Sequence, residues 1–363
     1  MINLPDNLFK LLQAEAFKRD FYKFVLKAFE IMHNGQTPAT NWHIEEMCII
    51  AQSEVDRIIK GKKRDKHVIC NVPPRSLKSF VWSVCLPAWA WSKAPHLKFV
   101  NVSYSADLSN EHNGKTRNLI ESEWYSELFE NVRIARGENK KSSFQTTEGG
   151  ARWSTSMNGT ITGKGADIII FDDPMNPKKA HSDTERESTI RNFKETFQSR
   201  LNSPEIGSFF IIEQRLHEED VTGYVLANQK DSYTHYSFPA TNKGEIVPAR
   251  YAEKYKSVKG REETYLFPKR FTPKFLNDQK INLGSYGYAG QYLQAPAPAE
   301  GGILKKAWFN IMDNESFYSI TKNGVYDLFV DSAYTAKTEN DATAVMVACK
   351  VKNMIYVCKV IEM

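Results

Sequence analysis

A lysine and a serine stand side by side at Lys78 and Ser79, directly after a turn that holds Pro73 and Pro74. The apolar run from Val68 to Val72 precedes this turn, and a helix-like apolar pattern follows it, so the stretch predicts strand, tight loop and helix. In that arrangement the Lys78 ammonium can reach the β- and γ-phosphates of a nucleotide, and the Ser79 hydroxyl can bind magnesium. The match to the pattern G-x-x-x-x-G-K-[ST] is poor, because Val72 and Leu77 stand at both glycine positions. Taken by itself, the pair is better explained as a helix start with a solvated lysine.

Two adjacent carboxylates, Asp172 and Asp173, end a second buried strand predicted at Ile168 to Phe171. In a nucleotide hydrolase the first carboxylate holds magnesium and the second orients the attacking water. A strand that ends in Asp-Asp-Pro is also compatible with a simple turn or a helix cap. The carboxyl ends of parallel strands meet at one sheet edge, so the acid pair and Lys78 together favour a nucleotide site.

A third strand is predicted at Phe209 to Ile212, and it ends in Glu213, Gln214 and Arg215. A polar group there can sense whether the γ-phosphate is present and pass that state to a moving part. The alternative is an arginine paired to an acid of the following segment, for which Glu218, Glu219 and Asp220 are candidates.

Two further pairs of residues have types that could bind ligands. Trp42 and His43 open a helix that Asn41 can cap, where they could meet an adenine, although a tryptophan packed under the helix is as good an interpretation. Asp331 ends a late strand and Asp341 precedes the next, so the two could share a divalent metal for phosphodiester cleavage.

The composition predicts a soluble globular protein, with 363 residues, 41% hydrophobic and 25% charged. A net charge of +5 favours a polyanionic partner. Five cysteines without CxxC spacing indicate a reducing compartment and no zinc site. The start of the chain does not read as a signal peptide, and the longest apolar stretch, Val81 to Trp91, is too short to span a membrane. Alternating strands and helices predict a parallel sheet covered on both faces.

Taken in order, these motifs resemble one family, the large subunit of the terminase of tailed bacteriophages, over roughly residues 40 to 350. The stretches that carry the resemblance are a deviant Walker A loop at Pro73 to Ser79, a strand and helix start at Ser103 to Leu108, a Walker B strand within Gly159 to Pro174, a coupling segment at Gln214 to Gly223, a junction at Tyr292 to Phe309, and nuclease strands around Asp331 and Asp341.

The resemblance implies a P-loop NTPase of the additional-strand type, with a mostly parallel α/β sheet flanked by helices, followed by a truncated RNase H-like α/β nuclease segment. The implied divisions are an N-terminal helical segment at 1–60, an ATPase core at 61–235, a lid or linker at 236–302, and the start of the nuclease at 303–363. A complete nuclease needs further strands and another acidic ligand, so we expect little or no DNA cleavage by this polypeptide. Robust, Asp331-dependent plasmid nicking with manganese would contradict that.

The site residues that the resemblance implies fall into three groups. The catalytic residues are Arg75, Lys78, Lys164, Asp173 and Arg215; the ATP-binding residues are Trp42, His43, Pro74, Arg75, Ser76, Leu77, Lys78 and Ser79; the metal ligands are Ser79 and Asp172 for magnesium with ATP, and Asp331 and Asp341 for Mg²⁺ or Mn²⁺ in the nuclease. Three positions depart from the family. Many members have glycine at Leu77, glutamate at Asp173, and arginine at Lys164, where a finger can act across a subunit boundary; Arg152 is a substitute for that finger.

The implied function is an ATPase that drives double-stranded DNA into a procapsid. The implied partners are DNA, a portal protein, a small terminase subunit and other copies of the chain in a ring, expected to have five members, with no membrane. The implied location is the host cytoplasm, transiently at the portal vertex, and not the mature virion. The alternatives are a DNA-binding docking or scaffold protein that uses ATP only as a switch, and a helicase-like translocase, which is disfavoured because no second helicase motif set follows Gly223.

Overall fold

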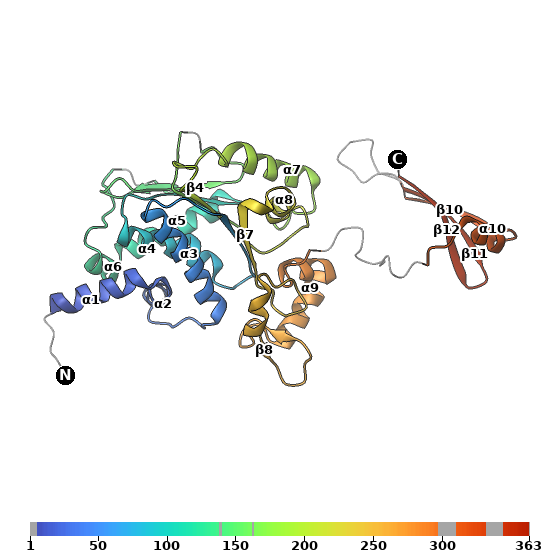
Figure 1. Ribbon diagram of the computed structural model, residues 1–363, viewed down its shortest axis with the longest axis horizontal. Coiled ribbons are helices and arrows are strands. Elements are labelled where there is room, and N and C mark those ends of the chain that lie inside the picture. Colours follow the sequence, from blue (N-terminus) through green and yellow to red (C-terminus); the bar gives the residue numbers. More distant parts are fainter. Residues whose placement is uncertain (1–5, 138–139, 162, 297–309, 332–343, 363) are drawn as a thin grey trace. The chain divides into compact units, whose positions relative to one another are not determined.

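A computed structural model describes residues 6–137, 140–161, 163–296, 310–331 and 344–362. The chain forms two compact units, Met1–Pro298 and Ala299–Met363 (Figure 1). The finer division at residues 60, 235 and 302 stays a prediction. Within the described ranges, every helix is too short or too polar to cross a membrane.

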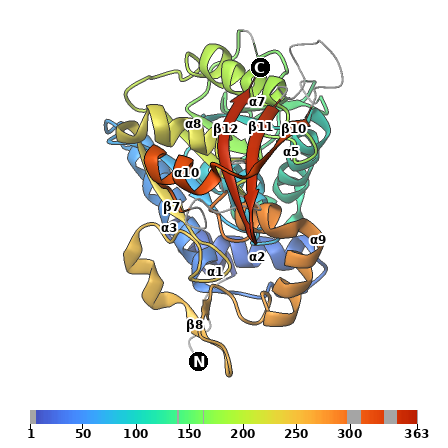
Figure 2. The ribbon, with the colours of Figure 1, turned by 90° about the vertical axis from the view of Figure 1, so that its right-hand side faces the viewer.

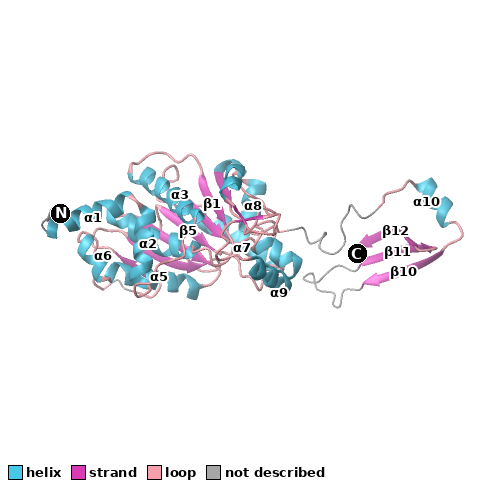
Figure 3. Ribbon diagram, turned by 90° about the horizontal axis from the view of Figure 1, so that it is seen from below, coloured by secondary structure: helices cyan, strands magenta, loops and turns pink. Residues whose placement is uncertain are grey.

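The first unit is built on a seven-stranded sheet with the order β3-β4-β2-β5-β6-β1-β7. Only β3 runs antiparallel to its neighbour, so the mostly parallel α/β sheet expected from the sequence is confirmed (Figure 3). The strands are β1 (His67–Asn71), β2 (Lys98–Ser103), β3 (Ser143–Gln145), β4 (Ala151–Ser156), β5 (Ile168–Asp172), β6 (Ser208–Glu213) and β7 (Tyr233–Ser237). Because β6 lies between β1 and β5, the sheet has the additional strand that the sequence predicted.

Helices cover both faces of this sheet, because alternate residues of each strand join different hydrophobic clusters. On one face, Val68 and Ile170 pack with the helices that precede β5 in the chain. On the other face, Ile69 and Phe171 pack with the helices that follow β5. The first group is α1 (Asp6–Arg19), α2 (Phe21–Met32), α3 (Trp42–Ile59), η1 (Phe80–Cys85), α4 (Leu86–Lys93), α5 (Ala106–Glu121) and α6 (Glu123–Leu128); the second is α7 (Asp183–Asn192), η2 (Phe193–Phe197) and α8 (Val221–Asn228).

The helix that follows the lysine-serine pair is anchored by tryptophans. It opens as the π-helical segment η1 and continues as α4, and Trp82, Trp89 and Trp91 on it are fully buried. The indole of Trp82 donates to the backbone oxygen of Met47 at 3.0 Å. This helix therefore has little freedom to shift, which fixes the residues at its start.

One detail of the first unit differs from expectation. Asn41 stands at the N-cap of α3, but its side chain makes no cap hydrogen bond and donates to the backbone oxygen of Leu266 at 2.8 Å. The remaining elements of this unit are η3 (Lys230–Ser232), η4 (Ala249–Lys254), β8 (Lys256–Ser257), β9 (Thr264–Tyr265) and α9 (Pro273–Gln291), which is kinked at Gly284.

The second unit contains α10 (Asn314–Thr321) and an antiparallel sheet of β10 (Val325–Asp331), β11 (Ala344–Val351) and β12 (Met354–Glu362). Figure 2 shows the three strands side by side. The late strand expected to end at Asp331 is confirmed as β10. Asp331 is the last residue of β10, while Asp341 lies outside the described residues. Assignment of this sheet to a nuclease, and its metal site, stay predictions.

Candidate functional site

The lysine-serine pair and the acid pair meet at the carboxyl edge of the sheet. Lys78 Nζ lies 3.0 Å from Oδ1 of Asp173. The Ser79 hydroxyl donates to Oδ1 of Asp172 at 2.9 Å. Lys78 Nζ also donates to Oε1 of Gln214, the residue after β6, at 3.4 Å. Three segments that are far apart in the sequence thus place one cation, two carboxylates, a hydroxyl and an amide within one cluster, because β1, β6 and β5 are neighbours.

Asp172 is fully buried, and its two oxygens have different partners. Oδ1 accepts from Ser79, whereas Oδ2 accepts from the Ser83 hydroxyl at 2.7 Å and lies 3.4 Å from Nδ1 of His112. Burial lowers the pKa of His112, although the charge of Asp172 opposes this, so His112 stands beside the carboxylate as a neutral ring. Burial likewise lowers the pKa of Arg152 to about 9, against the opposing effect of Asp172.

The carboxyl group of Asp173 has a raised pKa. Burial raises its pKa, the ammonium of Lys78 lowers it, and the charge of Asp172 raises it again. Its backbone has φ 44°, a left-handed conformation that aspartate and asparagine adopt more readily than most residues. A raised carboxyl pKa suits proton abstraction near neutral pH. An aspartate at this position thus fits both the left-handed backbone and a role in proton abstraction.

The loop before Lys78 takes left-handed backbone conformations without any glycine. Arg75 has φ 64° and Leu77 has φ 60°. Leu77 stands where many members of the resembling family have glycine, and the structure shows that Leu77 adopts a glycine-like conformation itself. For residues other than glycine this costs about 1–2 kcal/mol each. The loop is therefore strained at two positions that flank Ser76.

This strain leads to a prediction at Arg75, whose side chain is exposed. Arg75→Gly and Arg75→Ala both remove the guanidinium, but only glycine relieves the left-handed backbone. We expect Arg75→Gly to be more stable than Arg75→Ala by about 1 kcal/mol, measured by urea unfolding. Equal stabilities of the two variants would show that the loop carries no strain at Arg75. The same pair at Lys230, where no left-handed conformation occurs, is the control and should favour alanine.

A cavity of about 70 Å³ adjoins this loop. His43 and Leu77 face it from one side, and Phe267 and Arg270 from another. His43 is fully buried, and burial lowers its pKa to about 3, so its ring is neutral. At 70 Å³ the cavity is far smaller than the roughly 300–1,000 Å³ of ligand pockets. A nucleoside would therefore fit only after the lining residues move apart.

Trp42, the other residue expected beside an adenine, is not among the residues that line this cavity. Its ring stacks on Tyr251 with centroids 5.5 Å apart and meets Phe238 edge to face at 5.2 Å. The structure thus brings His43 to the loop and places Trp42 in a neighbouring aromatic cluster. This is the packing role that the sequence left open as the alternative.

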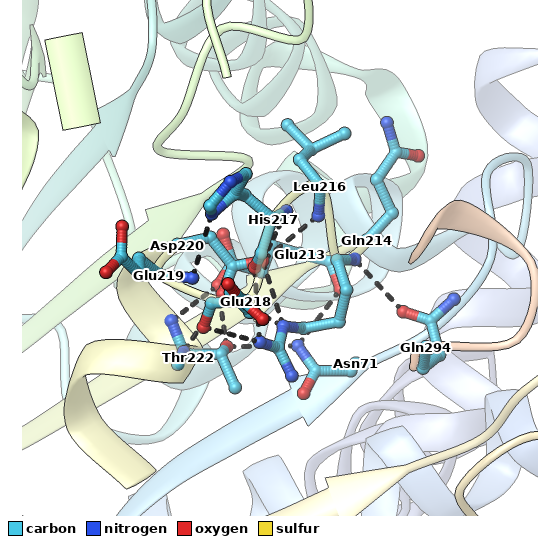
Figure 4. A network of polar contacts seen from close by, with 12 residues as sticks. Asn71, Glu213, Gln214, Leu216, His217, Glu218, Glu219, Asp220, Thr222 and Gln294 are labelled. Carbon is cyan, nitrogen blue, oxygen red and sulfur yellow. Dashed lines mark hydrogen bonds and ion pairs between the residues drawn. The ribbon is translucent and has the colours of Figure 1, made fainter. Parts of the chain in front are cut away.

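Arg215 contacts Asp220, His217 and Glu218, which Figure 4 labels within a network of polar contacts. Its Nε donates to both oxygens of Asp220 at 2.9 Å, and its Nη2 donates to the backbone oxygens of His217 and Glu218 at 3.3 Å. The pairing with an acid of the following segment, one of the two alternatives weighed above, is what the structure shows. Arg215 has no contact with Lys78 in the described part of the chain, and its neighbour Gln214 makes that contact instead.

Glu213, at the end of β6, links this network to β1. Its Oε1 accepts from the backbone N–H and the hydroxyl of Thr222 at 2.9 and 2.6 Å. Asn71, the last residue of β1, donates to the backbone oxygen of Glu213 at 3.3 Å. Burial, followed by the charge of Asp220, raises the pKa of Glu213 from 4.5 to about 8.

The raised pKa of Glu213 predicts a pH dependence of stability. Between pH 4.5 and 8 the folded state binds more protons than the unfolded state, so the free energy of unfolding falls as pH rises through this window. Glu213→Gln keeps an acceptor oxygen but cannot ionise, so it should gain on the order of 2 kcal/mol relative to wild type between pH 6 and pH 8. Chemical unfolding at several pH values measures this. The exposed control Glu187→Gln should follow wild type, and a parallel curve for Glu213→Gln would contradict the expectation.

The two candidates for a finger acting across a subunit boundary differ in exposure. Lys164 is exposed, with its Nζ 5.4 Å from the ring centroid of Trp153. Arg152 is fully buried and donates to the Thr116 hydroxyl at 2.7 Å, so the expectation that it could replace Lys164 in a neighbouring subunit was wrong. The role of Lys164 stays a prediction.

The donors at this site fit magnesium. Ser79 and Asp172 offer hard oxygen ligands, and Mg²⁺ is commonly held by one or two carboxylates together with substrate phosphates and water. Within the described ranges, no group of three or more His, Cys, Asp or Glu residues could hold a metal. A magnesium site here would thus depend on phosphate oxygens for its remaining ligands.

Two residues with a clear place in this site, Ser83 and His112, were missed in the sequence. Ser83 follows Ser79 by four residues, a spacing that puts both hydroxyls on one side of a helix and could have been noticed. No local signal marks His112, because α5 brings it to Asp172 only through the tertiary fold.

No protein family matches the chain in a scan of family descriptions, and no curated protein matches it in sequence. Among solved structures, it is similar to the large terminase of bacteriophage HK97, with 10% identity and a TM-score of 0.47 over 92% of this chain and 65% of that one. It is also similar to the large terminase of the thermophilic bacteriophage D6E in complex with ADP, with 11% identity and a TM-score of 0.38 over 86% and 67%. A complex of the D6E protein with ATP-gamma-S gives 10% identity and a TM-score of 0.35. The chain thus spans 65% to 67% of these proteins' lengths.

Proposed function

We propose that this chain is an ATP-hydrolysing motor that moves double-stranded DNA into a viral procapsid, as the large subunit of a terminase. The observation that carries the ATPase part is the convergence of Lys78 and Ser79 on Asp173 and Asp172, at 3.0 and 2.9 Å. The DNA-translocating part rests on the order of motifs along the sequence and on the net positive charge.

In the proposed reaction each residue has one task. Lys78 moves from Asp173 to the β- and γ-phosphates, where its ammonium stabilises charge that develops on the transferred phosphoryl group. This movement removes the cation that lowers the pKa of Asp173, so the freed carboxylate becomes a better base for the attacking water. Magnesium, when bound, neutralises charge on the phosphate oxygens, and Ser79 and Asp172 would hold it. Gln214 accepts a hydrogen bond from Lys78, so a movement of Lys78 to the phosphates would break this bond. The segment after β6, which begins with Gln214, would then respond to the bound nucleotide.

The remaining parts of the proposal concern partners and location. The chain would form a ring, expected to have five members, on the portal of a procapsid, together with a small terminase subunit, in the cytoplasm of the host. Lys164 would then complete the site of a neighbouring subunit. Cleavage of concatemers by a metal-dependent nuclease would belong to a complete nuclease domain that includes Asp331 and Asp341.

The test separates a motor from a switch by counting turnovers. A motor should release many phosphates per chain from ATP, and the rate should rise with double-stranded DNA and with protein concentration as rings assemble. A docking protein that uses ATP only as a switch would bind ATP and release at most one phosphate per chain. Single-turnover behaviour in the presence of DNA and portal protein would contradict the proposed motor.

A further inference from the structure

A layer of buried polar side chains lies between α5 and the sheet. The strand residues of this layer face the same side, because Phe99 and Ile170 of the first hydrophobic cluster alternate with residues of the second. We call this set the α5 polar layer; it consists of Asn101 and Ser103 of β2, Arg152 and Ser154 of β4, Asp172 of β5, Ser83 of η1, and His112, Asn113 and Thr116 of α5.

This layer is unusual because many of its atoms have no partner. Among the described residues, both polar atoms of the Asn101 side chain, Nδ1 of His112, and Nε and Nη2 of Arg152 are buried without a hydrogen bond. A buried polar group without a partner costs about 1–3 kcal/mol. Such a cost in one place indicates a role beyond packing.

Asp172 is the only carboxylate of the α5 polar layer, and two other residues of the layer lie next to its Oδ2 atom. Ser83 donates to Oδ2 at 2.7 Å, and His112 Nδ1 lies 3.4 Å from the same oxygen, long for a hydrogen bond, and has no hydrogen-bond partner among the described residues. Oδ1 contacts Ser79, the residue that would share the metal. The carboxylate thus has an anchored oxygen and an oxygen that faces the nucleotide loop.

Arg152 supplies the buried positive charge of the layer. It is fully buried, and burial lowers the pKa of its guanidinium, whereas the charge of Asp172 raises it. Its Nη1 donates to the Thr116 hydroxyl at 2.7 Å, and this hydroxyl in turn donates to the backbone oxygen of Val84 at 2.9 Å. The cation is therefore fixed between α5 and η1, next to the residue Ser83 that contacts Asp172.

We propose that Ser83 and His112 are positioning residues that hold Oδ2 of Asp172, so that Oδ1 alone is presented to the magnesium that accompanies the nucleotide. Arg152 belongs to the same layer, where its bond to the Thr116 hydroxyl fixes it between α5 and η1. The inference rests on the proposed ATPase function and extends it to residues that would contact neither nucleotide nor metal.

The test measures how nucleotide binding depends on magnesium in the whole 363-residue chain. ADP with a fluorescent ribose label is titrated at a series of Mg²⁺ concentrations, and the half-saturating Mg²⁺ concentration is read from each variant. Ser83→Ala should raise that concentration by about 10–100-fold, as expected for loss of a group that orients a metal ligand. His112→Leu should raise it in the same direction, whereas His112→Asn, which retains a nitrogen donor, should recover most of the wild-type value.

Ser92→Ala is the matched control. The Ser92 hydroxyl is also buried, in the continuation of the same helix, and it donates to the backbone oxygen of Trp89 at 2.7 Å instead of to Asp172. Ser92→Ala should lower the thermal unfolding temperature about as much as Ser83→Ala does. Its half-saturating Mg²⁺ concentration should stay at the wild-type value. If Ser83→Ala does not fold, Ser83→Cys keeps the size of the side chain with a weak donor and should show the same rise.

Three outcomes decide the proposal. A rise for Ser83→Ala and His112→Leu with no change for Ser92→Ala supports it. A half-saturating Mg²⁺ concentration within twofold of wild type in both Ser83 variants, with nucleotide binding intact, overturns the positioning role while the proposed ATPase stands. Failure of the wild-type chain to bind nucleotide at any magnesium concentration overturns both.

Discussion

Lys78→Ala is expected to reduce multiple-turnover ATP hydrolysis by at least about 10²–10³-fold, which is the cost of removing one donor that stabilises transition-state charge. The Lys78 side chain is 7% exposed, and its ammonium contacts Asp173 and Gln214. Phosphate release at saturating ATP, with and without DNA, measures the effect. The expectation follows from geometry, because Lys78 is the cation at the centre of the cluster.

The control for Lys78→Ala is Lys230→Ala, which removes an exposed lysine from η3. It should hydrolyse ATP at the wild-type rate. Unfolding curves of both variants distinguish loss of chemistry from loss of fold, since Lys78→Ala leaves Asp173 without its cation and shifts that carboxyl towards its protonated form. A folded Lys78→Ala variant with turnover within threefold of wild type would place the nucleotide site elsewhere.

Asp173→Asn and Asp172→Asn are expected to fail in different ways. Asp173→Asn should bind nucleotide and magnesium normally but lose about 10²–10⁴-fold in turnover, the usual contribution of a general base. Asparagine accepts the left-handed backbone at φ 44°, so the fold should be kept. Asp172→Asn should instead raise the magnesium requirement for binding, because a neutral amide replaces the carboxylate that faces Ser79.

The two aspartate variants are compared by measuring binding and turnover separately. Fluorescent ADP titrated with magnesium reports binding, and phosphate release reports turnover. If Asp173→Asn changes the magnesium requirement while Asp172→Asn changes only turnover, the two roles must be exchanged. If both variants lose nucleotide binding and turnover to the same extent, the two aspartates act as a unit, and the assignment of separate roles is wrong.

The sheet and its central cluster could be predicted because their signals are local. Each of β1, β5 and β6 is a short apolar run that ends at proline or at charged residues, and parallel strands of this kind expose their carboxyl ends at one edge. This pattern alone places Lys78, Asp172 and Gln214 near one another. The order in which β6 lies between β1 and β5 followed from the resemblance rather than from periodicity.

The parts that could not be predicted depend on contacts between distant residues. β4 carries Arg152 and Ser154 on a buried face, so its pattern looks exposed although it lies inside the sheet. Arg215 has the same sequence neighbourhood whether it senses phosphate or pairs with Asp220, and only the fold selects between these. The conformation of Leu77 was equally hidden, because a residue type gives only a probability for a left-handed backbone.

The 70 Å³ cavity beside the loop has a kinetic consequence. Its walls come from His43 in α3 and from Phe267 and Arg270, more than two hundred residues later, so in the proposed ATPase a nucleoside placed beside His43 would require these two stretches to separate first. Such a separation is a unimolecular step, and the observed association rate should reach a plateau at high ATP concentration instead of rising in proportion to it. Any force that spreads these two stretches would therefore speed the binding of ATP.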